Sequence, residues 1–192
     1  MNFCSQCGQP VNLKIPDGDN RERHVCDHCD TIHYQNPRII AGCVPVVDDQ
    51  VLLCRRAIEP RHGLWTLPAG FMENGETTLE GALRECEEEA NAKIDNPILS
   101  GIFDIPHINQ VYMFYRGPIS QTQGGIITSG VDFSPGIESL EVALFRESEI
   151  PWDELAFPVM ELMLHHHFQD IKLNITEVRT GTISRPWKSL RT

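Results

Sequence analysis

The amino-acid sequence predicts an α/β fold, in which a mixed sheet carries helices on its faces and follows a small cysteine-rich unit. β-rich runs and helical runs alternate from residue 38 onward, without a strict strand–helix–strand rhythm. The first 34 residues are polar and poor in aliphatic side chains, so they cannot bury enough apolar surface to fold unaided. Asn36-Pro37 marks a boundary, because the residue before a proline is pushed out of helix. We therefore predict a small unit over 1–34, a main domain over 35–175 and a C-terminal tail over 176–192.

The main domain reads as a series of short elements. RIIAGCVPVV and QVLLCRR are β-rich runs joined by Asp48-Asp49, which indicates a hairpin. The loop-rich stretch GLWTLPAGFMENGE precedes a segment of helical periodicity, TTLEGALRECEEEANA. Three later runs read as strands: ILSGIFDI, QVYMFYRG and LEVALFR. Glycines predict a mobile loop in QTQGGIITSGVDFSPG. PWDELAFPVMELMLHHHF predicts an amphipathic helix that is broken or begun again near Pro158.

Charge and hydropathy restrict the classes of protein to which this chain can belong. Its 192 residues carry a formal net charge of −11, which repels phosphate backbones at long range and argues against nucleic-acid binding. No apolar run approaches the length that spans a bilayer. The start, MNFCSQCGQP, has neither the basic nor the apolar part of a secretory signal, so we expect a cytoplasmic protein.

Four of the seven cysteines form two C-x2-C pairs near the N-terminus, separated by 18 residues. They are Cys4, Cys7, Cys26 and Cys29. This spacing is that of zinc ribbons, and four thiolates make a closed tetrahedral site with a structural role. Zinc would supply the folding energy that so small a core lacks. Two redox pairs or free thiols are the alternative interpretation.

The helical segment over 77–92 has clear ends and one apolar face. Thr77 and Glu80 have the spacing of a capping box, and Asn91 can adopt the left-handed conformation that ends a helix. Five residues at offsets of three, four, seven and eleven form one apolar stripe. These residues are Leu79, Ala82, Leu83, Cys86 and Ala90. We therefore expect this helix to pack on the sheet.

Three glutamates on the same helix conflict with local helix physics. Offsets of three and four place Glu85, Glu88 and Glu89 side by side, where like charges destabilise a helix by roughly 0.2–0.5 kcal/mol per pair. They also lie in the last turns, where the macrodipole disfavours anions. A hard divalent cation such as Mg²⁺ or Mn²⁺ would remove the conflict, because it prefers carboxylate oxygens. A solvated acidic face is the alternative.

The arrangement from Gly70 to Glu89, G-x5-E-x7-R-E-x2-E-E, resembles the Nudix box, a long motif without gaps. The resemblance extends over residues 38–170, including the WTLPAGF lead-in and the ESLEVALF strand. Asn91 and Ala92 stand where the family usually has a glycine and a larger aliphatic residue, and Ala69 often corresponds to glycine. None of these departures removes a catalytic group. The resemblance implies a Nudix α/β/α sandwich whose box forms a loop–helix–loop.

The resemblance also implies roles for residues of the box. Glu85, Glu88 and Glu89 would bind the divalent metals, with the Ala69 carbonyl as a further ligand. Arg84 would orient the glutamates, since it can pair with Glu88 at i+4 and lies four residues after Glu80. Glu76 would hold the loop against the helix. Metal ions neutralise the charge of a phosphoanhydride and activate a bound water.

A carboxylate from a later loop often takes the proton of the attacking water in this family. Glu138 is the candidate here and Glu141 the second choice, with exposed strand-end glutamates as the alternative for both.

Other side chains have weaker indications. Three arginines between the hairpin and the box either meet a phosphate or form a solvated basic patch. They are Arg55, Arg56 and Arg61. Trp65 reads as a core aromatic residue. His165, His166 and His167 point three ways on a helix, so we interpret them as structural or surface residues. No substrate-binding residue is predicted.

The substrate class follows from the resemblance as well. A ribbon followed by a Nudix domain is the layout of NADH pyrophosphatases, but their S-Q-P-W-P-F-P-x-S array is absent. IPDGD, YQNPR, GLWTLPAGF, ESLE and LAFP are similar to a second ribbon-bearing group, plant chloroplast FAD and ADP-ribose pyrophosphatases. This similarity favours cleavage of ADP-ribose or FAD to AMP plus a second phosphate, with NADH as the alternative substrate.

A different class of function is a Nudix domain that binds a nucleotide without cleaving it and regulates a partner. Intact Arg84, Glu85, Glu88 and Glu89 argue against it, because a pure binder has no need of clustered acids. Homodimers are common in the family, so a homodimer is one expected assembly, although no residue pattern shows it.

Overall fold

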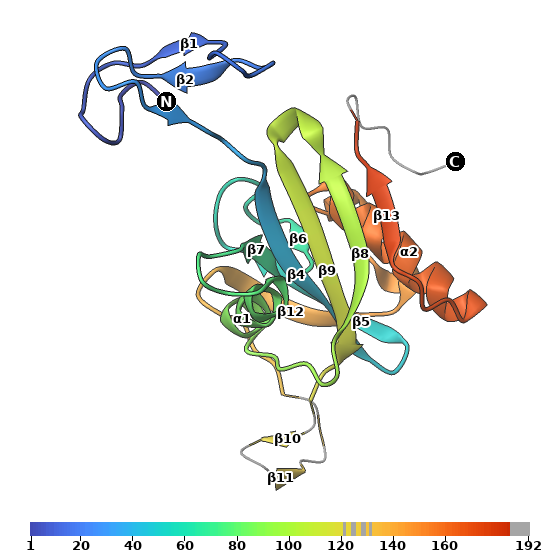
Figure 1. The fold of residues 1–192 in the computed structure, drawn as a ribbon. Coiled ribbons are helices and arrows are strands. Elements are labelled where there is room, and N and C mark those ends of the chain that lie inside the picture. Colours follow the sequence, from blue (N-terminus) through green and yellow to red (C-terminus); the bar gives the residue numbers. More distant parts are fainter. Residues whose placement is uncertain (121, 124–125, 128–129, 131, 185–192) are drawn as a thin grey trace. The chain divides into compact units, whose positions relative to one another are not determined.

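The computed structural model describes residues 1–120, 122–123, 126–127, 130 and 132–184. The chain divides into two compact units, Met1–Pro37 and Arg38–Thr192 (Figure 1). The boundary coincides with the predicted Asn36-Pro37 break. Each unit forms its own sheet, since the described strands of the first unit pair only with one another.

The first unit is a three-stranded antiparallel sheet of β1 (Asn12–Lys14), β2 (Arg23–Val25) and β3 (Ile32–His33). Its buried apolar residues are Cys4, Val25 and Cys26. Two of these three are cysteines of the C-x2-C pairs. So small an apolar core agrees with the prediction that this unit needs a metal to fold.

The second unit is built on a mixed sheet of eight strands, which confirms the predicted fold class. The path is β12-β5-β4-β9-β8-β13, with β6 paired to β5 and β7 paired to β4. The pairs β4–β9 and β8–β13 are parallel, and the other pairs are antiparallel. The bounds are β4 (Arg38–Val47), β5 (Gln50–Arg56), β6 (Trp65–Thr66), β7 (Ala69–Phe71), β8 (Ile98–Ile105), β9 (Gln110–Pro118), β12 (Ser139–Phe145) and β13 (Arg179–Thr182).

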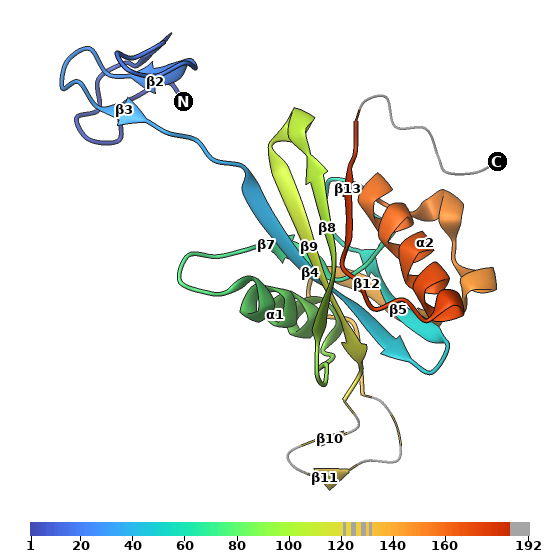
Figure 2. The same ribbon diagram turned by 45° about the vertical axis from the view of Figure 1, so that its right-hand side comes forward.

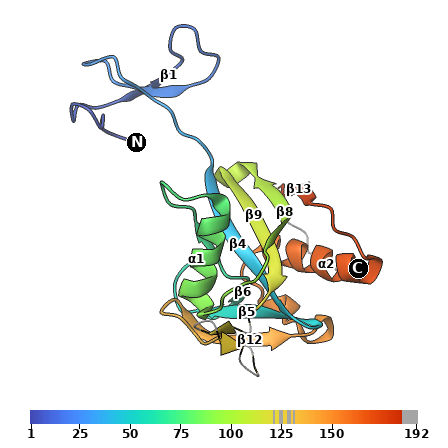
Figure 3. The same cartoon turned by 60° about the horizontal axis from the view of Figure 1, so that its bottom comes forward.

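One long helix covers each face of the sheet, α1 (Thr78–Ala90) and α2 (Pro158–Leu173) (Figure 2). The turned view in Figure 3 shows the same three layers. Alternation along the strands divides the core in two. Ala41 and Cys43 of β4 pack toward α1, whereas Val44 belongs to the cluster beneath α2. The chain thus forms the expected α/β/α sandwich.

Most predicted elements occur where the sequence places them. The hairpin β4–β5 turns at Asp48, whose φ of 53° is left-handed. Helix α2 begins at Pro158, after a 3-10 turn over Trp152–Glu154, so the helix is begun again as expected. Further 3-10 turns are Pro106–Ile108 and Glu147–Glu149.

Two regions differ from the predictions or fall outside the description. The stretch expected as a tail contains β13, which joins the edge of the sheet in parallel with β8. Of the predicted loop over 121–136, residues 121, 124–125, 128–129 and 131 lie outside the described residues, and β10 (Thr122–Gln123) pairs with β11 (Ile126–Ile127). No helix in the described part of the chain is long and apolar enough to cross a membrane.

Candidate active site

Helix α1 starts and ends as its sequence predicts. The Glu80 N–H donates to Thr77 Oγ1 at 3.2 Å, and the Thr77 N–H donates to Glu80 Oε2 at 2.7 Å, which completes the capping box. At the other end, Asn91 has a φ of 47° and donates its N–H to the Cys86 and Glu87 carbonyls. Asn91 therefore replaces the usual glycine without loss of the turn. Because Glu80 serves the cap, it forms no ion pair with Arg84 within 4.0 Å.

A loop crosses the C-terminal end of α1. The Ser134 N–H donates to the Ala90 carbonyl at 2.9 Å, and the Gly136 N–H donates to the Glu89 carbonyl at 3.0 Å. Asn91 Nδ2 returns a hydrogen bond to the Ser134 carbonyl at 3.1 Å. A Cβ on Gly136 would lie 1.7 Å from the Glu88 carbonyl oxygen, so only glycine fits there. This crossing carries the chain onward to Glu138.

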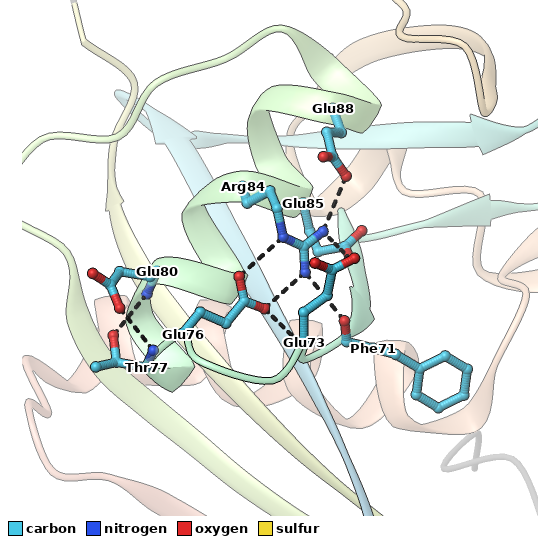
Figure 4. Close-up of polar contacts among 8 residues, drawn as sticks. All are labelled: Phe71, Glu73, Glu76, Thr77, Glu80, Arg84, Glu85 and Glu88. Atoms are coloured by element: carbon cyan, nitrogen blue, oxygen red, sulfur yellow. Dashed lines mark hydrogen bonds and ion pairs between the residues drawn. The ribbon is translucent and has the colours of Figure 1, made fainter.

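Arg84 organises the acidic side chains of the site (Figure 4). Its Nε donates to Glu76 Oε2 at 3.1 Å, and its Nη2 donates to Glu76 Oε1 at 2.9 Å. Its Nη1 donates to Glu85 Oε1 at 2.7 Å and to Glu88 Oε2 at 3.0 Å. Nη2 also reaches the Phe71 carbonyl at 3.1 Å. One guanidinium thus fixes the helix, its acids and the preceding loop.

Glu76 occupies the position predicted for it between loop and helix. Besides its two bonds from Arg84, its Oε1 accepts the Glu73 N–H at 2.7 Å. These bonds, those from Arg84 first, lower the pKa of Glu76 to about 2. A Cβ on Gly81 would lie 2.7 Å from Glu76 Oε1, so the helix surface is open at this point to receive the carboxylate.

Glu85 lies against the backbone of β7. A Cβ added to Gly70 would lie 2.3 to 2.4 Å from the three atoms of the Glu85 carboxyl group. The first glycine of the motif is therefore needed to make room for this carboxylate. Burial raises the pKa of Glu85, and the Arg84 guanidinium opposes the shift.

Glu89 is the buried acid of the site, with only 5% of its surface exposed. Burial, together with the charges of Glu85 and Glu138, raises the pKa of its carboxyl group to about 8, although the Ala69 N–H donates to its Oε2 at 3.1 Å and lowers the pKa. The structure thus brings Ala69 to the site. The contact it shows uses the N–H of Ala69, whereas the predicted metal ligand is the carbonyl of this residue.

The donor set suits a hard divalent cation. Glu85, Glu88 and Glu89 offer carboxylate oxygens on one helix face, and Glu89 is buried with no cationic partner within 4.0 Å in the part of the chain that the structure describes. In this structure Arg84 holds Glu85 and Glu88. Within the described ranges, the four ribbon cysteines are the one group of three or more such side chains whose ligand atoms all lie within 4.8 Å of one another. Cation binding would thus require the glutamates to converge.

A large cavity of about 1680 Å³ opens beside these acids. Its acidic part contains Arg84, Glu85, Glu88, Glu89 and Glu138. Its apolar part comes from several strands and from the segment before α2, and includes Ile40, Ile105, Tyr112, Phe157 and Ile183. The acids and an apolar compartment therefore share one continuous space, in which a ligand with both a charged and an apolar part can bind.

The two candidate late-loop carboxylates have different surroundings. Glu138 lines the cavity and raises the pKa of Glu85 and Glu89 by its charge. Glu141 is not part of the cavity wall and lies 3.7 Å from Arg55 in an exposed ion pair. The structure therefore brings Glu138 to the site, and leaves Glu141 outside it.

The secondary candidates have mostly structural surroundings. Trp65 is buried and packs edge-to-face on Phe145 at 4.9 Å, which confirms its core role. The three histidines point in three directions, as predicted: His165 stacks on Trp152, His166 stacks on Phe103, and His167 is buried. Of the three arginines, Arg56 lines the cavity, whereas Arg55 and Arg61 do not.

The four ribbon cysteines meet in a geometry that fits zinc. Cys4 Sγ lies 3.7 Å from Cys29 Sγ, and Cys7 Sγ lies 3.5 Å from Cys26 Sγ. A tetrahedral zinc ion with Zn–S bonds of ~2.3 Å separates its sulfurs by about 3.8 Å. The pairing of one cysteine from each C-x2-C motif is what a ribbon needs.

Part of the cavity wall has no recognisable signal in the sequence. Ile183 and Ser184 follow β13, in the segment expected as a tail, and line the cavity. Tyr112 and Phe157 were expected only as parts of a strand and of a helical segment. A strand of four residues with the sequence RTGT carries too few apolar residues for a pattern to reveal it.

Comparisons with known proteins agree with this geometry. The family model described as NUDIX domain matches residues 36–162, and the zinc-ribbon model described as Nudix N-terminal matches residues 2–35. The chain belongs to the Nudix hydrolase family. A solved Nudix hydrolase from Nitrosomonas europaea is 49% identical, covers 95% of this chain and 99% of its own, and superposes with a TM-score of 0.86.

Curated relatives match up to about half of the chain. A protein named NAD-capped RNA hydrolase NudC, from Edwardsiella ictaluri, is 36% identical over 97 residues, which cover 49% of this chain and 35% of that protein. An uncharacterized Nudix hydrolase, YvcI of Bacillus subtilis, is 38% identical over 81 residues, covering 40% of this chain and 49% of that protein. The matches thus span from a third to half of the length of these relatives. The predicted family, fold class and enzyme class are confirmed.

Proposed function

We propose that this Nudix hydrolase is a metal-dependent diphosphatase, which cleaves a nucleoside diphosphate linked to another moiety into AMP and a second phosphate. The observation that carries the proposal is the set of acids ordered by Arg84, with Glu89 buried, at one end of a large cavity. A binding protein without catalysis has no need of clustered acids, and acids whose pKa is raised in a cavity are typical of functional sites.

Each residue of the site has a part in this proposal. Glu85, Glu88 and Glu89 would hold Mg²⁺ or Mn²⁺, with the Ala69 carbonyl as a further ligand, and the bound cation would neutralise phosphate charge and acidify a water. Arg84 orients the acids, and Glu76 fixes Arg84 against the loop. The contacts of Arg84 with Glu76 and with the loop are already formed before a substrate binds.

Glu138 is the proposed proton acceptor. It lines the same cavity as the three glutamates and interacts with two of them electrostatically. A carboxylate in this place takes the proton from a water that attacks phosphorus. Glu141, three residues later on β12 and outside the cavity, is a matched control.

ADP-ribose and FAD are the favoured substrates. The cavity of about 1680 Å³ exceeds what a drug-sized ligand fills, roughly 300–1,000 Å³, and so has room for two linked nucleoside-sized moieties. Tyr112 and Phe157 offer aromatic surface for a ring. NADH is the second candidate, supported by relatives that are named as hydrolases of NAD-capped RNA. Because of those names, an RNA end also belongs among the test substrates.

For the N-terminal unit we propose one structural zinc ion held by Cys4, Cys7, Cys26 and Cys29. The two Sγ–Sγ distances of 3.5 and 3.7 Å support it. The division into a ribbon over residues 1–34 and a Nudix domain over 35–175 is supported by the two compact units.

The test is a substrate panel with Mg²⁺ or Mn²⁺, in which release of AMP is measured. The panel contains ADP-ribose, FAD, NADH, a diadenosine polyphosphate, a nucleoside triphosphate and NAD-capped RNA. We expect ADP-ribose or FAD to have the highest kcat/KM. Highest activity on NADH or on the capped RNA would transfer the proposal to that substrate. No AMP from any substrate would favour a nucleotide-binding regulatory role.

Matched variants connect the activity to the site. Glu88→Gln should lower kcat by roughly a hundredfold or more, because a metal ligand is lost. Glu138→Gln should lower kcat and change its pH dependence, whereas Glu141→Gln should leave both unchanged. A fully active Glu88→Gln protein would refute the metal-site assignment.

A further inference from the structure

Arg56 is a cation in the wall of the cavity, and no acidic side chain among the described residues forms an ion pair with it. It ends β5, has 9% of its surface exposed, and lines the same cavity as Glu85 and Glu89. Burying a guanidinium group is costly unless an anion or several acceptors compensate for the lost water. The contacts of Arg56 therefore show what it is prepared to bind.

Those contacts leave most of the guanidinium group unused. Its Nε donates to the Pro60 carbonyl at 3.0 Å, and its central carbon lies 5.3 Å from the centre of the Phe157 ring. A guanidinium group has five N–H donors. Neither Nη1 nor Nη2 forms a hydrogen bond or an ion pair with a described residue.

The comparison with Arg84 makes the difference clear. Arg84 is the other arginine among the described residues that line the cavity, and it binds Glu76, Glu85 and Glu88. Arg56 lies close enough to Glu89 to lower the pKa of this acid, but beyond the 4.0 Å of an ion pair. Arg56 thus faces the acidic site across a gap.

We propose that Arg56 binds a phosphate group of the substrate's diphosphate through its free Nη1 and Nη2 atoms. The proposal rests on the proposed function, because it assumes a ligand with two linked phosphates. The phosphate under attack then lies at the glutamates, and its neighbour lies at Arg56. Planar guanidinium groups bind phosphate with two parallel hydrogen bonds, which also fixes the orientation of the ligand.

Phe157 and Pro60 hold Arg56 in place for this role. The ring of Phe157 covers one face of the guanidinium group, and the Pro60 carbonyl takes the Nε proton. Both contacts restrict the side chain while they leave the Nη atoms free. A phosphate therefore meets a donor pair that is already ordered, and binding loses little conformational entropy.

Arg55 provides a matched control one residue away. It carries the same charge on the same strand, but its side chain pairs with Glu141 at 3.7 Å and is not part of the cavity wall. Its Nε donates to the Gly63 carbonyl at 2.9 Å, much as Arg56 binds Pro60. If positive charge alone attracted the ligand, replacing either arginine would weaken binding. If Arg56 binds the phosphate directly, only its replacement would do so.

The first test measures binding without turnover. Calorimetry without added Mg²⁺ or Mn²⁺, which leaves the proposed zinc ion in place, gives the affinity of the full-length protein for ADP-ribose, for inorganic pyrophosphate and for adenosine. We expect Arg56→Gln to weaken the binding of ADP-ribose and of pyrophosphate by roughly tenfold to a hundredfold, the range for the loss of hydrogen bonds to charged groups. The affinity for adenosine should stay unchanged. The affinity of Arg56→Lys for ADP-ribose and pyrophosphate should lie between those of the wild type and Arg56→Gln, because lysine keeps the positive charge but lacks the two parallel N–H donors of the guanidinium group. Arg55→Gln should bind like the wild type.

The second test uses turnover with Mg²⁺, where Arg56→Gln should raise the KM for ADP-ribose by a similar factor. Unchanged affinity and KM in Arg56→Gln would overturn the proposal. Equal losses for adenosine and ADP-ribose would overturn it as well, since they indicate a packing role. If the glutamine variant does not fold, the lysine variant decides between the same outcomes. A wild type that binds pyrophosphate through Arg56 but hydrolyses nothing would refute the proposed function alone.

Discussion

At the scale of single residues, the site shows how side chains with opposed preferences are kept together. Glu89 is buried, and Glu85 is partly buried against Gly70, so removal from water destabilises the charged form of both carboxyl groups. Arg84 offsets part of this cost for Glu85 but forms no ion pair with Glu89. The stability of the metal-free protein should therefore depend on pH through Glu89.

Replacing Glu89 by glutamine should stabilise the metal-free protein at high pH. The pKa of Glu89 is about 8 in the folded chain and about 4.5 when unfolded, so the folded state holds the proton between these values. Stability of the wild type then rises as pH falls from about 8 to 4.5. The melting midpoint of Glu89→Gln should exceed that of the wild type most above pH 8, and the difference should vanish near pH 4.5. Glu88→Gln, at an exposed position, is the control, and a constant difference across this range would contradict the argument.

Gly70→Ala should reduce activity through Glu85. The added Cβ would lie 2.3 Å from Glu85 Oε1, so the carboxylate must move away from its place. We expect a loss of kcat of roughly tenfold or more, since misplaced catalytic groups of about 1 Å cost on the order of a hundredfold. Gly181→Ala is the control, because its Cβ would make ordinary contact with Phe103 at 3.4 Å. Equal activity of the two variants would speak against the role of Gly70.

At the scale of elements, β13 is tied to the sheet by hydrogen bonds and to α2 by an ion pair. Arg179 donates through Nε to Asp170 Oδ1 at 2.8 Å, and Asp170 has a side chain only 1% exposed. Arg116 lies 4.0 Å from the same carboxylate. After β13, the Ile183 N–H donates to the Asp104 carbonyl at 2.8 Å, which brings Ile183 into the cavity wall.

Arg179→Ala should therefore affect both stability and substrate binding. Removing Arg179 takes the nearest cation away from the buried Asp170 carboxylate, so the free energy of unfolding should fall, and the nearby Arg116 should limit the loss. Urea unfolding measures this change. The KM should rise more than kcat falls, because Ile183 is an apolar residue of the cavity wall and not one of the proposed catalytic groups. Arg179→Ala with unchanged stability would show that β13 is held by its strand pairing alone.

At the scale of elements, the sequence predicts contacts between neighbouring residues but not contacts between residues far apart in the chain. Contacts within one helix or hairpin follow from local spacing, so the caps of α1 and the turn at Asp48 were predicted correctly. The bond from Asn91 to Ser134 joins residues 43 positions apart, and no local pattern contains it. Glu76 illustrates both cases: its motif position was recognised, but its bonds to Arg84 depend on how the loop folds back.

The cavity wall was the least predictable part for the same reason. Its residues come from β4, β5, β7, β8, β9 and α1, from the segment before α2 and from the two residues after β13, and only the tertiary fold brings them together. The sequence shows that residue 56 is an arginine, but not which way its side chain points. That it faces the cavity, while Arg55 faces Glu141, follows from the alternation of β5 and from its register with β12.

At the scale of the whole molecule, the two units differ in what stabilises them. The Nudix unit has apolar clusters on both faces of its sheet, whereas the first unit buries only Cys4, Val25 and Cys26 as apolar residues. This difference supports the proposed zinc ion as a replacement for the missing core of the first unit.

Removal of zinc should unfold the first unit and leave the second folded. Mercurial titration in the presence of a zinc indicator should release one zinc ion per chain. Limited proteolysis after release should then cut within residues 1–37, while the fragment from Arg38 resists. Cys26→Ser should give the same pattern without titration. Resistance of residues 1–37 in the zinc-free protein would contradict the proposed structural site.

The strand pairing has a consequence for how the sequence of this protein can evolve. Every pairing of the eight-stranded sheet lies after Pro37, and every pairing of the three-stranded sheet lies before it. No hydrogen-bonded ladder among the described strands would be interrupted if another module were joined at this point. Recombination at the linker can thus exchange the leading module as a unit, and each half can accumulate substitutions without spoiling the register of the other.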